Sequence, residues 1–191
     1  MLRKSPKPRK LNLGCGVNKL DGYINIDMAP NVAPDKCFDF TSCRWPFKDG
    51  TVDEIVIFHT IEHIRKPLHN YVISECGRVL KKGGLLLISF PDFWECAKNW
   101  HDNLRGARDF WEATLFGRQM FPSDYHVCAM CPDELKEILI SWGFSSIRML
   151  KEDPPNEFNT IMAAIKLKKA YTRYEDLIKE DVGNMAVVEK S

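Results

Sequence analysis

The chain has 191 residues, of which 45% are hydrophobic and 28% are charged, and its 27 basic and 26 acidic residues leave a net charge of +1. This composition excludes an intrinsically disordered chain, and the length fits one well-packed domain better than two. No run approaches the ~20 apolar residues of a membrane span, and no apolar segment follows the basic first residues as in a secretory signal, so we expect an intracellular, cytoplasmic protein.

The basic charge is concentrated at the N-terminus. Residues 1–10 carry five basic side chains and no acidic one, so the rest of the chain is mildly acidic. We interpret residues 1–9 as a solvated basic arm on an acidic body. This distribution is not typical of a nucleic-acid-binding domain, and a nucleic-acid partner is not expected.

Predicted strands and helices alternate along most of the chain. Short apolar or alternating runs predict strands, in chain order, at residues 10–13, 23–27, 35–40, 51–58, 85–89, 146–151 and 158–167. Apolar residues at helical spacing predict a helix that begins near Leu68 and stops at Gly83-Gly84. A second helix is predicted to begin at Pro132 and to end at Gly143.

The segment from residue 90 to about residue 125 interrupts this alternation. It is rich in aromatic residues with charged residues between them, and we predict that it forms one or two short helices laid over the core. We therefore expect one domain over residues 10–168 that contains this insertion, followed by a polar tail over residues 169–191.

Strands that alternate with helices predict an α/β fold with a mainly parallel sheet. Ligands of such sheets bind beyond the carboxyl ends of the strands. This rule selects the residues that follow the predicted strands, namely Gly14-Cys15-Gly16, Asp27, Asp39, His59 and Pro91-Asp92.

The first of these positions indicates a nucleoside site. Gly14-Cys15-Gly16 lets the backbone approach a ligand closely, and Asp27 can accept hydrogen bonds from two ribose hydroxyl groups. A dinucleotide site would have a third glycine where Lys19 stands, and its acidic residue would lie about 20 residues further on. The alternative is a plain tight turn beside a surface carboxylate.

Five segments resemble, in order and spacing, motifs of class I S-adenosylmethionine-dependent methyltransferases of the small single-domain type. They are Leu11–Gly16, Trp45–Ile55, His59–Ile64, Arg78–Gly84 and Trp142–Phe144. The resemblance covers roughly residues 10–168. It implies a doubly wound, mainly parallel seven-stranded sheet of Rossmann-like type, S-adenosylmethionine as cofactor, and a methyl acceptor as substrate.

The resemblance also implies a role for each matching residue. The Gly14-Cys15-Gly16 turn would line the methionine part of the cofactor, Asp27 would hold the ribose, and Met28 would pack on the adenine. Asp39 and Phe40 would meet the adenine edge.

Two further positions of the motifs bear on the cofactor. His59 would lie near the sulfonium and the substrate. Asn12 stands where the family commonly has an acidic residue, and Asn18 stands where it has a third glycine. Asn12 would keep the hydrogen bonding of the acidic residue without its negative charge.

Three residues are candidates for a base that activates the acceptor, namely His59, Asp92 and His126. A neutral sugar hydroxyl is a poor nucleophile, so its methylation benefits from a base. We expect the acceptor to be an oxygen or nitrogen of a small molecule or saccharide. Trp94, Trp100 and Trp111 of the insertion would then be sugar platforms, unless they form the insertion's own core.

Two other functions remain open at this stage. One is a non-catalytic binding module with the methyltransferase fold. The other is a zinc hydrolase, because His59-Thr60-Ile61-Glu62-His63 spells the H-x-x-E-H signature. That signature needs both histidines on one helical face, whereas His59 follows a strand directly. Cys128-x-x-Cys131 lacks a second ligand pair, so we assign no metal ligands from the sequence.

Overall fold

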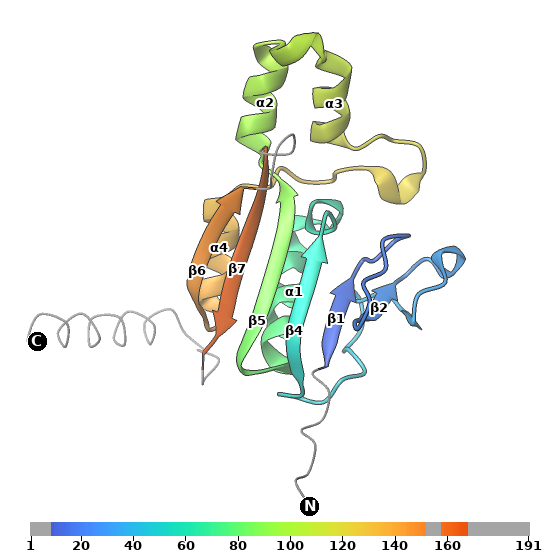
Figure 1. Cartoon of the computed structure of the whole chain (residues 1–191), viewed down its shortest axis with the longest axis vertical. Helices are drawn as coiled ribbons and strands as arrows, with labels where there is room; N and C mark the ends of the chain where they lie inside the picture. Colours follow the sequence, from blue (N-terminus) through green and yellow to red (C-terminus); the bar gives the residue numbers. More distant parts are fainter. Residues whose placement is uncertain (1–8, 152–157, 168–191) are drawn as a thin grey trace, which may run out of the picture.

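The computed structural model describes residues 9–151 and 158–167. The predicted arm, apart from residue 9, and the predicted tail lie outside the described residues. The described part forms one seven-stranded sheet with the strand order β3-β2-β1-β4-β5-β7-β6 (Figure 1). None of its helices has the length and apolar character needed to cross a bilayer.

The sheet is mainly parallel, as predicted. Strands β1 to β5 pair in parallel, whereas β7 runs antiparallel to its neighbours β5 and β6. The bounds are β1 (Lys10–Leu13), β2 (Ile24–Asp27), β3 (Lys36–Cys37), β4 (Val52–Phe58), β5 (Leu80–Pro91), β6 (Phe144–Lys151) and β7 (Asn159–Lys166). The carboxyl ends of β1, β2 and β4 therefore lie at one edge, where the sequence analysis expects the ligand.

The helices take two positions relative to the sheet (Figure 1). Helices α1 (Lys66–Val79) and α4 (Pro132–Ser141) contact each other and pack on the sheet. Helices α2 (Phe93–His101) and α3 (Arg108–Phe116) pair beyond the carboxyl end of β5, within the segment for which one or two short helices were predicted. Four short 3-10 helices complete the described elements: η1 (Pro30–Val32), η2 (Ile61–His63), η3 (Leu104–Gly106) and η4 (Pro122–Asp124).

Two predicted boundaries were wrong. Helix α1 does not run to Gly83-Gly84 but ends at Val79, because Leu80 is already extended, with φ −65° and ψ 138°. The two glycines instead lie inside β5, opposite the irregularity between Val52 and Glu54 of β4. The predicted strand 35–40 shortens to two residues, because Asp39 turns the chain by accepting a hydrogen bond from the backbone of Thr41.

The main core lies between the sheet and the pair α1 and α4. Alternate residues of β5, Leu86, Ile88 and Phe90, are fully buried there, while Leu85 and Leu87 on the other face are half-buried. A smaller cluster of Cys96, Trp111, Leu115 and Phe158 joins the insertion to the start of β7.

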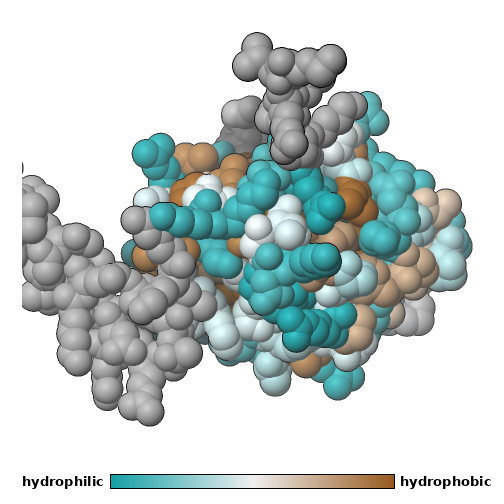
Figure 2. All heavy atoms as spheres, turned by 90° about the horizontal axis from the view of Figure 1, so that it is seen from below, coloured by the Kyte–Doolittle hydropathy of each residue, from teal (hydrophilic) through white to brown (hydrophobic). Residues whose placement is uncertain are grey.

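The amino ends of the parallel strands carry ion pairs between charged side chains. Figure 2 looks onto this end, and hydrophilic side chains gather at its middle. Lys81 pairs with Asp53 at 2.6 Å and Lys10 pairs with Glu54 at 2.7 Å. These ion pairs link neighbouring strands at the end of the sheet opposite the expected ligand site.

A buried ion pair holds the segment between β3 and β4 against α1. Glu75 accepts hydrogen bonds from the backbone N–H of Trp45 at 2.8 Å and from two nitrogens of Arg78 at 2.6 Å. Arg78 also donates to the carbonyl of Phe47 at 2.8 Å. Burial alone would raise the pKa of Glu75, but the hydrogen bonds from Arg78 and Trp45 outweigh it and hold that pKa below its ordinary value of 4.5.

Glu75→Gln should lower the free energy of unfolding by about 3 kcal/mol at pH 7, because it removes one partner of a buried pair. A lowered folded pKa means that the wild-type contribution is present above the unfolded pKa and is lost as pH falls through the folded one. The deficit measured by urea unfolding should therefore shrink at acid pH. Asp102→Asn is the control, since it breaks an exposed pair with Lys98 and should leave the free energy of unfolding almost unchanged. Equal effects of the two variants would contradict the buried-pair argument.

Candidate functional site

The carboxyl ends of β1 and β4 meet at Gly14. This glycine has φ +66°, and a Cβ built there would lie 2.3 Å from Cγ2 and 2.5 Å from Oγ1 of Thr60. Thr60 in turn donates its hydroxyl hydrogen bond to the carbonyl of Phe58 at 2.9 Å. Only glycine allows this contact, so the first glycine of the motif is explained by packing as well as by backbone conformation.

The second glycine faces open space. Gly16 has φ +49°, and no atom lies within 4 Å of a Cβ built on it. Its N–H donates to Oδ2 of Asp27 at 2.8 Å, and Oδ1 of Asp27 accepts from the N–H of Ala29 at 2.9 Å. The predicted pair of glycine turn and acidic residue is therefore assembled at one edge. Met28 follows with 60% of its surface exposed.

Cys15 lies between the two glycines and is buried. Its burial, followed by the charge of Asp27, raises the pKa of the thiol. Cys15 is therefore a packing residue, and its backbone N–H and carbonyl are bonded to Ile26 and Asn18 within the turn.

Asn12 lies beneath the turn rather than in it. Its buried amide donates to the side-chain oxygen of Asn25 at 3.0 Å and to the carbonyl of Asn18 at 3.1 Å. Asn25 in turn donates from its backbone and its side chain to Asp35. These bonds hold the link between β1 and β2 in place of a helix, so Asn12 positions the turn.

The predicted adenine-edge residues differ from each other in their surroundings. The carboxylate of Asp39 accepts from the backbone and the hydroxyl of Thr41, and these bonds outweigh burial and lower its pKa. The ring of Phe40 is buried and packs edge-on against Trp45. That ring belongs to the core, so a role for Phe40 at a ligand would fall to its backbone.

His59 leaves β4 in a strained conformation. Its φ is +47°, a left-handed value that is uncommon for a residue with a side chain. Its Nδ1 lies 3.7 Å from Oε1 of Glu62, and its Nε2 lies 3.3 Å from the hydroxyl of Ser89. Because the helical turn η2 begins only at Ile61, His59 and His63 do not share a helical face, as the H-x-x-E-H signature would require.

The other two candidate bases have different partners. The ring of His126 stands edge-on to that of His63, with centroids 4.8 Å apart, and burial lowers the pKa of His126. Asp92 is the N-cap of α2, where it accepts from the N–H of Trp94 at 3.2 Å, and it lies 3.5 Å from Nζ of Lys151. The structure therefore brings His59 and His126 to Glu62, whereas the contacts of Asp92 are those of a capping residue.

The three tryptophans of the insertion fall into two groups. Trp111 is 3% exposed and packs edge-on against Phe158, so it is a core residue of the insertion. Trp94 and Trp100 are 69% and 41% exposed and remain available as platforms for a ligand.

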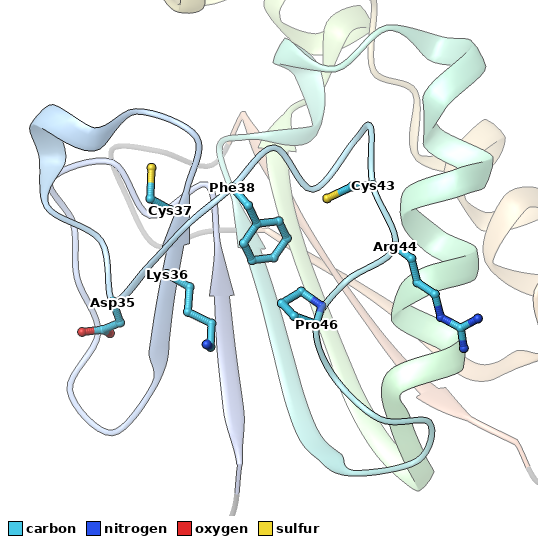
Figure 3. Close-up of a pocket in the computed structure, with 7 residues that line it drawn as sticks. All are labelled: Asp35, Lys36, Cys37, Phe38, Cys43, Arg44 and Pro46. Atoms are coloured by element: carbon cyan, nitrogen blue, oxygen red, sulfur yellow. The ribbon is translucent and has the colours of Figure 1, made fainter.

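Two other features of the chain do not belong to this site. Cys128 and Cys131 are free thiols, and burial raises the pKa of Cys128 to about 11. An open hollow lies beside the edge strand β3 (Figure 3), lined by Asp35, Lys36, Cys37, Phe38, Cys43, Arg44 and Pro46. Its lining includes neither the glycine turn nor Asp27 nor His59, although Cys37 and Phe38 pair with Asp27 along β2 and β3.

The chain shows a likeness to known methyltransferases. Residues 11–88 match a family model described as a methyltransferase domain. A probable S-adenosylmethionine-dependent methyltransferase of Mycobacterium tuberculosis is 29% identical over 104 residues, which cover 54% of this chain and 31% of that relative. This chain therefore spans less than a third of the relative's length.

Solved structures extend the likeness over most of the fold. A methyltransferase from Archaeoglobus fulgidus superposes with a TM-score of 0.59 at 18% identity, and covers 83% of this chain and 86% of its own. Phosphoethanolamine N-methyltransferase 2 of Haemonchus contortus, in complex with S-adenosyl-L-methionine, superposes with a TM-score of 0.56 at 14% identity. The match covers 87% of this chain and 50% of that protein. At these identities the likeness shows the fold alone.

Gly14→Ala should destabilise the protein by about 3 kcal/mol, from overpacking against Thr60 and left-handed strain. Gly16→Ala carries only the strain, and should cost about 1 kcal/mol. Urea unfolding of both variants measures the difference. Adding Thr60→Gly to Gly14→Ala should recover part of the loss, because it removes the atoms that the new methyl group meets. Equal costs at the two glycines would contradict the close contact.

Proposed function

We propose that this chain is a class I S-adenosylmethionine-dependent methyltransferase, which binds S-adenosylmethionine and transfers its methyl group to an oxygen or nitrogen of a small-molecule or saccharide acceptor. The observation that carries the proposal is the bond from the N–H of Gly16 to the carboxylate of Asp27 at the carboxyl edge of the sheet. It sets a backbone turn and a hydrogen-bond acceptor side by side, as a nucleoside ligand requires.

The residues at this edge fit the cofactor. The space over Gly16 is open, so a ligand can approach its backbone closely. Each oxygen of Asp27 accepts one backbone hydrogen bond and keeps a lone pair for a ribose hydroxyl. Met28 offers an exposed apolar side chain to the adenine beside them. The bound cofactor would supply a methyl group on a positively charged sulfur.

The acceptor side of the site lies at the end of β4. His59 is half-exposed there and stands beside the buried Glu62. It would receive the proton of an acceptor hydroxyl or amine, while most of the rate comes from holding the acceptor in line with the methyl group. Exposed aromatic side chains of the insertion, Trp94 above all, support a small or saccharide acceptor.

Asp27→Ala should weaken binding of S-adenosylmethionine by roughly 10–100-fold, because hydrogen bonds to a charged acceptor are worth about 1.5–3 kcal/mol. Isothermal titration calorimetry with S-adenosylmethionine and with S-adenosylhomocysteine measures the change. Circular dichroism checks that the variant is folded.

Asp21→Ala is the matched control for this experiment. Asp21 is an exposed aspartate of the same link, so its removal changes the charge without touching the ribose site. Unchanged affinity in Asp27→Ala would remove the ribose assignment. Wild-type protein that binds neither ligand would overturn the proposed function, and binding without turnover on any acceptor would leave a binding module.

A further inference from the structure

A buried carboxylate lies without a hydrogen-bond partner behind the acceptor side of the site. Glu62 is 2% exposed, and neither of its carboxylate oxygens accepts a hydrogen bond from any residue that the structure describes. The Nδ1 of His59 lies 3.7 Å from its Oε1, beyond hydrogen-bond distance. An ionised carboxylate is rarely left in this state, since buried charges are normally paired or bound to a metal.

Two imidazoles face this carboxylate. One ligand atom from each of Glu62, His63 and His126 lies within 4.8 Å of the other two. A Zn²⁺ ion at about 2.1 Å from each ligand would hold these atoms roughly 3–3.5 Å apart, so the three ligand atoms would move closer together when the ion binds. Two histidines and one carboxylate are a ligand set that binds divalent transition metals.

The ring of His63 is oriented for such a role. Its Nδ1 lies 2.9 Å from the carbonyl oxygen of Tyr125, which can only accept a hydrogen bond. Nδ1 therefore carries the proton, and the lone pair is on Nε2. A histidine that binds a metal commonly donates its other N–H to a carbonyl in this way.

His126 is anchored from its other side. Thr114 and Leu115, in the last turn of α3, line one cavity together with His126. The backbone N–H of His126 donates to the carbonyl of Phe116 at 3.1 Å. The insertion thus fixes the third group against the first two.

Backbone bonds also lock the loop that carries His126 to η2. The N–H of Val127 donates to the carbonyl of Glu62 at 3.0 Å. On the far side, the buried His69 bonds to the carbonyls of Ile61 and Ile64 at 3.1 and 2.8 Å and holds η2 on α1. The cluster is therefore preorganised by its surroundings. Glu62 and His126 also line a narrow cavity whose other walls are largely apolar, including Leu115 and Met130.

We propose that Glu62, His63 and His126 bind one divalent transition-metal ion at the carboxyl end of β4. The ion supplies the positive charge that the buried carboxylate lacks. The two imidazoles select Zn²⁺ or Co²⁺ over Mg²⁺, which prefers oxygen ligands. Three protein ligands leave coordination positions for water or for an oxygen of the acceptor.

The site has a consequence for methyl transfer that rests on the proposed function. An acceptor hydroxyl bound to the ion would lose its proton to solvent more readily. His59 lies next to Glu62 and would then position the acceptor rather than act as its sole base. The metal site itself does not depend on this role.

The test is metal binding by the full chain, measured by equilibrium dialysis with Zn²⁺ and by the absorption of bound Co²⁺. We expect about one ion per chain and a cobalt spectrum without thiolate charge transfer. Glu62→Gln and His126→Ala should each weaken Zn²⁺ affinity by more than about 100-fold, since loss of an outer-shell partner alone costs about 10–100-fold.

Two controls separate this site from the other ligands of the chain. His101→Ala removes an exposed histidine of α2, and Cys128→Ser with Cys131→Ser removes both thiols of the C-x-x-C pair; both should leave binding unchanged. Zn²⁺ should raise the melting temperature of the wild type but not that of Glu62→Gln. Without metal, Glu62→Gln should be at least as stable as the wild type, because it removes an uncompensated buried charge.

Zn²⁺ binding that survives in Glu62→Gln and His126→Ala would overturn the inference, as would equal affinity for Mg²⁺ or no binding by the wild type. Calorimetry with S-adenosylhomocysteine on the same samples keeps this outcome apart from a failure of the proposed function. A protein that binds the cofactor product and no metal contradicts the metal site alone, and the converse result contradicts the methyltransferase proposal alone.

Discussion

The contact between Gly14 and Thr60 fixes the geometry of the whole functional edge. Strands β1 and β4 are neighbours in register, with Leu13 opposite Ile57, so their carboxyl ends must diverge into different turns within one or two residues. A glycine without Cβ lets the Thr60 side chain lie directly on the β1 turn. The glycine turn and Asp27 then extend to one side, and His59 with η2 extends to the other. The cofactor and acceptor halves of the proposed site therefore share this one contact.

The link between β1 and β2, on the cofactor side of the proposed site, is short. The ten residues between β1 and β2 form turns, and their backbone groups are held by Asn12 and Asn25. An amide at position 12 suits this task, because it can donate to Asn18 and Asn25 at once, whereas an ionised carboxylate can only accept. The negative charge of the network is on the exposed Asp35, whose pKa is lowered by hydrogen bonds from Asn25. An amide at position 12 therefore suits the short link between β1 and β2.

The sequence predicted those parts of the site that local pattern determines. Period-two and apolar runs located the strands, and the rule for parallel sheets then placed Asp27 and His59 at the same edge. It did not predict the end of α1, because Gly83-Gly84 has the pattern of a helix stop although the two glycines lie at an irregularity between β4 and β5. It also did not predict that His126 lies beside Glu62, because their proximity depends on how α2 and α3 fold back across more than 60 residues. The H-x-x-E-H signature can be read from the sequence. Which histidines lie beside Glu62, however, depends on the tertiary fold.

Several unfavourable local features lie at this edge. His59 adopts a left-handed conformation, Glu62 buries a carboxylate without a hydrogen bond, and His126 is buried enough for its pKa to fall. Elsewhere the molecule satisfies comparable groups, as Glu75 does through Arg78 and the backbone of Trp45. Glu62 and Glu75 are 2% and 7% exposed, so burial alone does not explain the difference between them. Glu75 is fully paired, whereas Glu62 has no hydrogen-bond partner and lies beside the two imidazoles. We therefore infer that Glu62 binds a ligand that the protein itself does not supply.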